Sequence, residues 1–240
     1  MTNIHRMIES RVSSWFKQLD EATSMKHRPR ENKPYVTISR QSGAYGTTIA
    51  EMLAEYLSKR ERRRDAVWAI FDKDLIKKVI DDNKFPGKYE QYFSEYAMPA
   101  IQDIMEDLLR VHPPHETLVR KMSETIFKLS SVGYVIILGS GGNIITQKIP
   151  DGIHIRLICS MDKRVAHMKE VLGISEKEAR DHVIKEDRTR EDYIKKYFHK
   201  DIDDVSLYDI VINMDTVPLD DAVRIIGETA LKGKGKAQPA

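Results

Sequence analysis

The residues with the clearest capacity for chemistry stand in one glycine-bearing loop. Arg40 precedes this loop, which consists of Ser42, Gly43, Ala44, Tyr45, Gly46, Thr47 and Thr48. A glycine-bearing turn that runs into a helix offers unpaired backbone N–H groups and the positive end of the helix dipole. That geometry binds phosphate. An ordinary strand-to-helix turn that contains two glycines is the alternative interpretation.

The loop differs from the motif G-x-x-x-x-G-K-[ST], whose lysine reaches the β and γ phosphates. Gly46 stands in the place of the lysine, and Thr48 stands in the place of the magnesium-binding hydroxyl. Arg40 is the nearest candidate to replace the lysine, because a guanidinium can grip phosphate oxygens in a bidentate manner. The alternative is an ion pair with a carboxylate elsewhere. As a solvent-exposed arginine, Arg40 is expected to contribute little to folding.

A second concentration of charge lies in residues 175–200, where Arg180, Arg188 and Arg190 are interleaved with carboxylates. A solvated helix stabilised by i,i+4 ion pairs explains this pattern. The functional alternative is a lid whose arginines fold over transferring phosphates. Phosphoryl transfer requires positioning, magnesium and positive charge on the moving group, and a closing lid excludes water.

Asp72 ends an apolar run, AVWAIFD, that has the character of a strand. In open α/β sheets, ligands bind at the carboxyl ends of the strands, so this carboxylate is a candidate ligand contact. A role as the cap of the next helix is the alternative, because Asp often serves there. A further apolar run, YVIIL, ends in the loop GSGGN, which contains Gly139 and Ser140.

Apolar runs of strand length alternate with helical patterns along the chain. The runs are YVTIS, AVWAIFD, YVIIL, IHIRLICS and YDIVIN. Such alternation predicts an α/β fold with a parallel, doubly wound sheet. The central domain is expected over residues 34–231, with a helical insert at about 74–131 and an arginine-rich lid at about 175–200.

The flanks of this domain differ from it in character. Residues 1–33 combine an amphipathic helix, with an apolar stripe that contains Trp15 and Phe16, and a polar linker. The stripe is expected to pack either on the domain or on a second subunit, so a homodimer through this helix is possible. Residues 232–240, KGKGKAQPA, are of low complexity and are predicted to be disordered.

Composition restricts the classes of partner. The 240 residues carry a net charge of only +2 although 32% of them are charged, which gives no support to nucleic-acid binding. The single cysteine, Cys159, excludes an internal disulfide and suits a reducing cytoplasm. No apolar run approaches the roughly 18 residues of a membrane span. We therefore expect a cytoplasmic protein with no nucleic-acid or membrane partner.

Five motifs in this order resemble the cytidylate kinase-like family. The family typically shows ISRQ-x-G-x-x-G, a YDK-type acidic segment, VI-x-GRG, D-R-x-R and YDL-x-IN. This chain has ISRQSGAYG, FDKDLI, VIILGSGG, EDRTR and YDIVIN, and the resemblance covers roughly residues 34–231. Where the GRG loop of the family carries arginine, this chain has Ser140.

The resemblance implies a P-loop-type core and a kinase that moves the γ-phosphoryl group of Mg-ATP onto a nucleoside monophosphate. In that role the loop of residues 42–48 cradles the donor phosphates, and Thr48 holds Mg²⁺. Positive charge on the transferring group comes from Arg40, Arg180, Arg188 and Arg190. The acceptor is contacted by Asp72, Gly139 and Ser140. Two alternatives remain: a nucleotide-binding regulatory module without turnover, and a structural oligomer.

Overall fold

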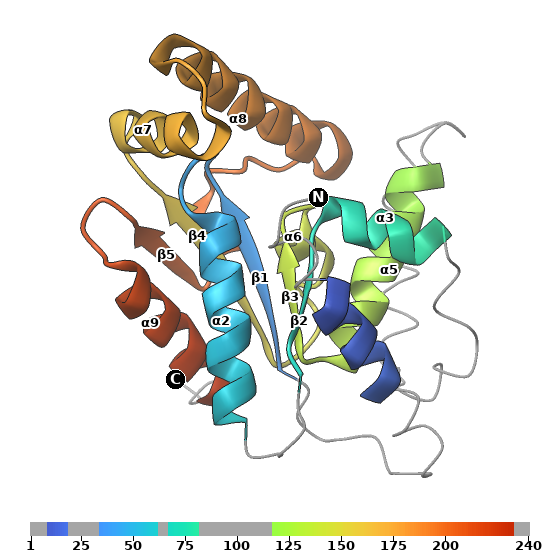
Figure 1. Ribbon diagram of the computed structural model, residues 1–240. Coiled ribbons are helices and arrows are strands. Elements are labelled where there is room, and N and C mark those ends of the chain that lie inside the picture. The colour runs from blue at the N-terminus through green and yellow to red at the C-terminus, as the bar shows by residue number, and fades with distance from the viewer. Residues whose placement is uncertain (1–8, 19–33, 62–66, 82–116, 233–240) are drawn as a thin grey trace, which may run out of the picture.

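The computed structural model describes residues 9–18, 34–61, 67–81 and 117–232. Five strands form one sheet, in which every pair is parallel. They are β1 (Tyr35–Arg40), β2 (Ala69–Phe71), β3 (Val135–Leu138), β4 (Gly152–Ile158) and β5 (Ile210–Asn213). Their order across the sheet is β2-β3-β1-β4-β5 (Figure 1). The predicted parallel α/β sheet is confirmed.

The sheet is buried on both faces at its centre. Every residue of β3 is buried, as expected for a continuous apolar run in a central parallel strand. Val36 of β1 lies between Ile136 of β3 and Ile153 of β4 in the register of the sheet. Because the carboxyl ends of parallel strands meet at one edge, this register brings the loops that follow β1 and β3 together.

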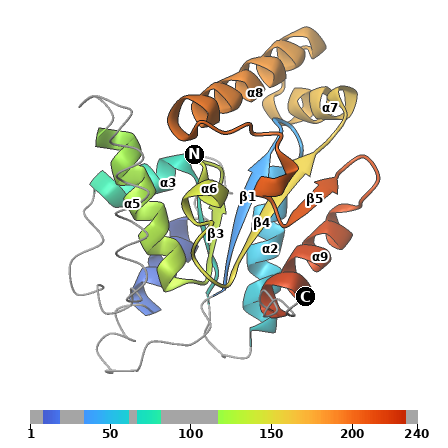
Figure 2. The same cartoon turned by 180° about the vertical axis from the view of Figure 1, so that it is seen from behind.

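Helices cover both faces of the sheet. On one side lie α2 (Gly46–Arg60) and α9 (Leu219–Lys232), and on the other lie α5 (Thr117–Val132) and the one-turn helix α6 (Gly142–Ile145) (Figures 1 and 2). Helix α3 (Lys73–Asp81) follows β2 and packs against α5. The sequence pattern predicted all of these helices except α6. Residues 82–116 of the expected helical insert lie outside the described residues, as does the tail beyond Lys232.

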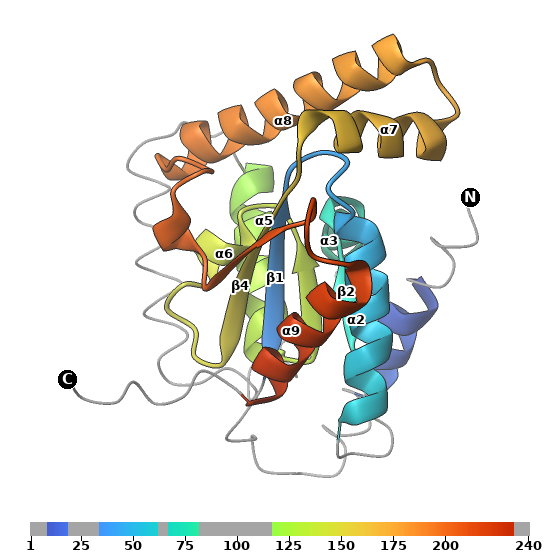
Figure 3. The ribbon, with the colours of Figure 1, turned by 90° about the vertical axis from the view of Figure 1, so that its left-hand side faces the viewer.

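Two helices form a hairpin over the carboxyl edge of the sheet. They are α7 (Met161–Leu172) and α8 (Glu176–Phe198), and Figure 3 shows them lying across the ends of the strands. Gly173 ends α7 with a φ of 66°, and Ser175 opens α8 with the predicted capping box to Glu178. The hairpin has its own small core, formed by Val165, Ala179 and Val183.

The helix of residues 9–18 docks on the chain's own domain. Val12 and Trp15 are buried in the main core. The indole N–H of Trp15 donates to the carbonyl of Gly133 at 3.2 Å, and its ring meets Phe71 edge-on at 5.7 Å. Of the two expected uses of the apolar stripe, the structure shows packing within the chain. No helix in the described ranges is long and apolar enough to cross a membrane.

Candidate functional site

The loop between β1 and α2 has the geometry expected of an anion cradle. Gly43 has a φ of 81°, and Tyr45 caps α2 in the left-handed region with a φ of 59°. Within the described residues, no hydrogen bond is made by the backbone N–H groups of Gly43, Tyr45, Gly46, Thr47 and Thr48. Unpaired donors of this kind at a helix N-terminus are the groups that an anion site requires.

The two glycines of the loop are required by close packing. A Cβ at Gly43 would lie 2.6 Å from the backbone oxygen of Arg164, in the first turn of α7. A Cβ at Gly46 would lie 2.7 Å from Cγ of Arg40. The loop is therefore held between α7 and the side chain of Arg40, which fixes its conformation before any ligand binds.

Replacing Gly43 by alanine is expected to destabilise the protein by about 2–5 kcal/mol, since left-handed strain adds to a backbone clash. The matched control is Gly173→Ala, because Gly173 is also left-handed but has no atom within 4 Å of an added Cβ. The control should lose only about 1–2 kcal/mol. Urea unfolding of both variants measures the difference. Equal losses of unfolding free energy in the two variants would mean that packing of α7 against Gly43 does not constrain the loop.

Arg40 runs from the loop to the end of β3. Its stem passes Gly46, and a Cβ added to Gly139 would collide with its guanidinium. Burial lowers the pKa of Arg40 to about 9, and the neighbouring Arg190 acts in the same direction. The expectation of a solvent-exposed arginine is therefore wrong: Arg40 is half-buried, because two glycines make room for its side chain. Its charge is only partly compensated by the protein.

Of the two roles considered for Asp72, the structure shows that of helix cap. Its carboxylate accepts the backbone N–H of Leu75 at 2.9 Å and so caps α3. The same carboxylate is near enough to Arg40 to favour its charged form and oppose the lowering of its pKa. Asp72 thus lies at the carboxyl edge of the sheet, beside the guanidinium that follows β1.

The turn after β3 is closely packed. Gly139, Ser140 and Gly141 have successive φ values of 82°, 56° and 72°. The N–H of Gly139 donates to Ile38 of β1 at 3.0 Å, and a Cβ at Gly141 would lie 2.7 Å from the ring of Phe198. This turn therefore joins Arg40 to the end of α8. Its glycines make this close approach possible.

The hairpin contacts the loop through Asp187 of α8. One carboxylate oxygen accepts the N–H of Ser42 at 2.6 Å, and the other is paired with Arg164. One turn further along α8, Arg190 donates to the backbone oxygen of Arg40 at 3.2 Å. The carboxylate of Asp187 therefore accepts one N–H of the loop, and the guanidinium of Arg190 donates to the residue at which β1 ends.

Arg164 and His167 are functional candidates that the sequence pattern did not reveal. Arg164 is 5% exposed and donates to the carbonyl oxygens of Cys159 and Ser42 at 3.0 and 3.2 Å. The ring of His167 stacks on Tyr45 at 4.0 Å, and its Nδ1 lies 2.9 Å from the oxygen of Gly43. No pattern in the sequence indicated a role for either side chain.

The three predicted lid arginines differ in their exposure and in their partners. Arg190 is partly buried, and burial lowers its pKa. Arg180 is partly exposed and pairs with Asp162 at 3.1 Å, outside the loop contacts. Arg188 is exposed and has no hydrogen bond or ion pair with any described residue. Arg40, Arg164 and Arg190 are thus the arginines that the structure brings together at the loop.

Thr48 is the one predicted metal ligand. It lies in the first turn of α2, and its hydroxyl makes no hydrogen bond within the described ranges. Those ranges contain no group of three His, Cys, Asp or Glu side chains that could hold a metal ion. A single hydroxyl fits Mg²⁺, because this ion usually keeps several waters and binds few protein groups besides substrate phosphates.

The chain resembles known proteins in its sequence and in its fold. A profile described as the cytidylate kinase-like family matches residues 35–216. A solved structure of an uncharacterized protein from Eubacterium ventriosum has a TM-score of 0.63 at 20% identity, covering 82% of this chain and 97% of that chain. Shikimate kinase from Bacteroides thetaiotaomicron has a TM-score of 0.44 at 11% identity, covering 81% and 96%. No curated protein matches the chain.

Proposed function

The chain belongs to the cytidylate kinase-like family, and we propose that it is a nucleotide kinase that moves the γ-phosphoryl group of Mg-ATP onto a nucleoside monophosphate. The observation that carries this proposal is the loop of residues 42–48, with five unpaired N–H groups and three arginines around it. Family membership supports a nucleotide kinase-like function. The donor, the acceptor and turnover are our inference.

In the proposed reaction the loop holds the donor phosphates. The five unpaired N–H groups of the loop bind the β- and γ-phosphate oxygens, and the Thr48 hydroxyl would hold Mg²⁺. Magnesium neutralises charge on the phosphates when it is bound. An oxygen of the acceptor phosphate forms a bond to the γ-phosphorus while the bond from that phosphorus to the β-bridging oxygen breaks, releasing ADP.

The arginines supply positive charge where the lysine of other phosphate loops is missing. Arg40 is the most suitable replacement, because its enclosed charge would be better compensated by an anion than by the protein alone. Arg190 enters beside it from α8. Arg188 remains in the proposal because it is exposed and unpaired among the described residues, so its guanidinium is available to a ligand. The proposed role of Arg180 rests only on the resemblance to the family.

The acceptor is proposed to approach the carboxyl ends of β2 and β3. Asp72 and Gly139 lie there beside the guanidinium of Arg40, and Ser140 follows Gly139 in the chain. A small turn without bulky side chains at Gly139 permits a phosphate to approach Arg40 closely. Ser140 stands where the family has an arginine, so Arg40 has to supply more of the positive charge that neutralises the acceptor phosphate.

Calorimetry with ATP, ADP and pyrophosphate tests the binding half of the proposal. The folded protein is expected to bind all three, because each carries adjacent phosphates whose oxygens can accept hydrogen bonds from the loop N–H groups. Absence of binding at millimolar ligand would remove the observation on which the proposed function rests.

Asp187 is expected to compete with phosphate, because its carboxylate occupies the N–H of Ser42 and pairs with Arg164. Asp187→Asn should therefore tighten pyrophosphate binding by about tenfold, the equivalent of one weak charged contact. The control is Asp181→Asn, since Asp181 is exposed and unpaired among the described residues of the same helix. If Asp187→Asn weakens binding in calorimetry, the carboxylate positions Arg164 for the ligand and does not compete with it.

The regulatory module without turnover remains the second candidate. It is favoured by Asp187, which places a negative charge in the loop, and by the absence of the usual lysine. Both candidates predict nucleotide binding, so only the formation of ADP and a nucleoside diphosphate separates them.

A further inference from the structure

Helix α7 presents two side chains to consecutive carbonyl groups of the loop of residues 42–48. Nη1 of Arg164 donates to the carbonyl oxygen of Ser42 at 3.2 Å. Nδ1 of His167 lies 2.9 Å from the carbonyl oxygen of Gly43. Arg164 and His167 are three positions apart, so they lie on the same face of the helix. One turn of α7 therefore holds the acceptor side of the loop, and His167 has no part in the reaction proposed above.

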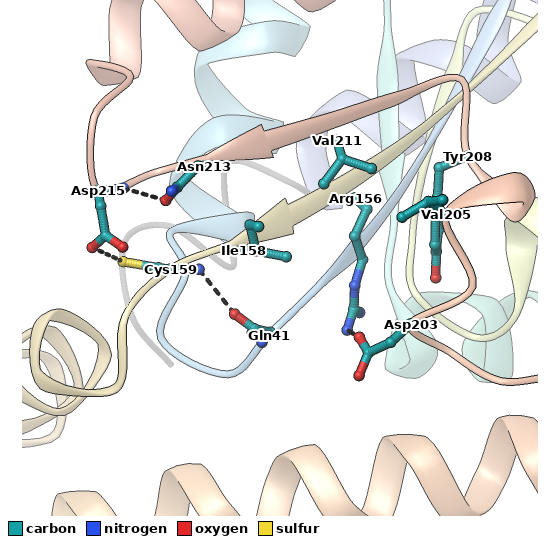
Figure 4. Close-up of a pocket in the computed structure, with 10 residues that line it drawn as sticks. All are labelled: Gln41, Arg156, Ile158, Cys159, Asp203, Val205, Tyr208, Val211, Asn213 and Asp215. Carbon is teal, nitrogen blue, oxygen red and sulfur yellow. Dashed lines mark hydrogen bonds and ion pairs between the residues drawn. The ribbon is translucent and has the colours of Figure 1, made fainter.

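The segment that leads into α7 is tied to Gln41, the residue before the loop. The amide oxygen of Gln41 accepts the backbone N–H of Cys159 at 2.9 Å (Figure 4). The backbone N–H of Gln41 donates to the backbone oxygen of Leu157 in β4 at 3.1 Å. At the other end of the segment, Nε of Arg164 donates to the carbonyl oxygen of Cys159 at 3.0 Å. The start of α7 is therefore fixed relative to the start of the loop, so a side chain of α7 can act on the conformation of the loop.

The contact between His167 and Gly43 determines where the imidazole carries a proton. A carbonyl oxygen accepts hydrogen bonds and cannot donate them, so Nδ1 of His167 must carry the hydrogen. Both the neutral tautomer with its hydrogen on Nδ1 and the imidazolium satisfy this condition. The imidazole is therefore a donor to the loop in either protonation state.

The carbonyl that His167 holds belongs to the peptide between Gly43 and Ala44. The N–H of the same peptide, on Ala44, donates to the backbone oxygen of Gln41 at 3.2 Å. The C=O and N–H of a trans peptide point in opposite directions, so this peptide is held on both sides. Such a peptide restricts ψ of Gly43 and φ of Ala44, two of the rotations that direct the unpaired N–H groups of the loop.

His167 also contacts a second left-handed residue of the loop. Its ring stacks on the ring of Tyr45, with the centres 4.0 Å apart and the planes inclined by 21°. Tyr45 has a φ of 59°, a conformation that residues other than glycine adopt infrequently. Left-handed residues in a turn direct successive N–H groups toward one side, which is the geometry of an anion-binding nest. One imidazole thus contacts both Gly43 and Tyr45, the two residues that give the loop this form.

We propose that His167 is a positioning residue, which holds the loop in its anion-binding conformation through Gly43 and Tyr45. The inference rests on the proposed function, because it takes phosphate binding by the loop as given. His167 acts on the N–H groups that bind phosphate and does not itself contact the ligand. Removing its donor is therefore expected to weaken binding of a phosphate ligand without abolishing it.

Two substitutions separate the hydrogen bond from the ring. His167→Asn places an amide NH₂ at the position of Nδ1 and removes the ring, whereas His167→Phe keeps a ring against Tyr45 and removes the donor. We expect His167→Phe to weaken pyrophosphate binding by about three- to tenfold, the range for the loss of one hydrogen bond. His167→Asn should recover most of this loss, because the hydrogen bond orients the peptide of the loop directly.

Calorimetry measures the Kd of pyrophosphate for the full chain, at a temperature at which urea unfolding shows every variant to be folded. The control is Lys169→Gln, at an exposed position of the same helix, which should bind pyrophosphate as the wild type does. A merely structural role of His167 would lower the urea midpoint and leave the affinity of the folded protein unchanged. The affinity is therefore the measurement that separates positioning from packing.

Three results would overturn the inference. If His167→Phe binds pyrophosphate as tightly as the wild type, His167 does not position the loop, and the proposed function stands. If His167→Asn binds as weakly as His167→Phe, a donor at the position of Nδ1 is not sufficient, and the proposed function again stands. If the wild type binds no pyrophosphate, this inference and the proposed function fail together.

Discussion

Arg190→Ala is expected to lower kcat by about 10³-fold or more, while the Kd of ATP changes far less. An arginine that stabilises the transferring phosphoryl group is worth about 10³–10⁵ in rate, and its loss appears in kcat because the contact forms in the transition state. Arg190 is the predicted lid arginine that reaches the loop, where it donates to Arg40 at 3.2 Å. Steady-state kinetics with calorimetry of ATP binding separates the two effects.

Two variants on the same helix complete the measurement. Arg180→Ala should change kcat by less than about threefold, because it removes an exposed ion pair with Asp162. Arg188→Ala is expected to lower turnover more than it weakens ATP binding. If Arg190→Ala leaves the rate unchanged, Arg190 is an ion-pair residue of a solvated helix. Arg188 would then be the remaining candidate among these arginines for stabilising the transferring phosphoryl group.

Arg40→Met is expected to reduce kcat/KM by about 10- to 150-fold. Charge-assisted hydrogen bonds contribute about 1.5–3 kcal/mol each, and their loss converts into this range of rate. Methionine keeps an unbranched stem of similar length in the space between Gly46 and Gly139. It therefore removes the guanidinium and empties only the space beside Gly139, while the stem beside Gly46 stays filled.

Measurements of Tm show whether an Arg40 variant loses activity through lost catalysis or through lost stability. The folded environment lowers the pKa of Arg40 to about 9, so its charge is disfavoured there, and Arg40→Met should keep Tm within a few degrees of the wild type. Arg40→Ala should be less stable, because it empties the space between the two glycines. A Tm loss in Arg40→Met as large as in Arg40→Ala, with unaltered kinetics, would make Arg40 a structural residue.

The parts of the fold that depend on local pattern were predictable. Alternation of apolar runs and amphipathic helices identifies the parallel sheet, and the Ser175 capping box identifies the start of α8. The conformation of the loop after β1 was also predictable, because a strand, two glycines and a helix N-terminus are consecutive in the chain. Helix α6 was missed because its four residues are too few for a helical period.

The parts of the site that depend on tertiary contacts were not predictable. The enclosure of Arg40 requires Gly139, which comes from a different strand, to lie against it. The role of Arg164 depends on α7 packing against Gly43, and nothing in the sequence relates these two positions. Asp187 and Arg190 have the same spacing as ordinary ion-pair residues, so only the fold shows that they face the loop.

The most direct test of the account is phosphoryl transfer itself. The full chain is incubated with Mg-ATP and, separately, with each common ribo- and deoxyribonucleoside monophosphate, and the products are separated by chromatography. We predict that at least one monophosphate is converted to its diphosphate with one ADP formed per turnover, and that omitting Mg²⁺ abolishes the reaction. If ATP binds in calorimetry but no monophosphate is phosphorylated, the kinase function is wrong, and the chain is a nucleotide-binding regulatory module of the same fold.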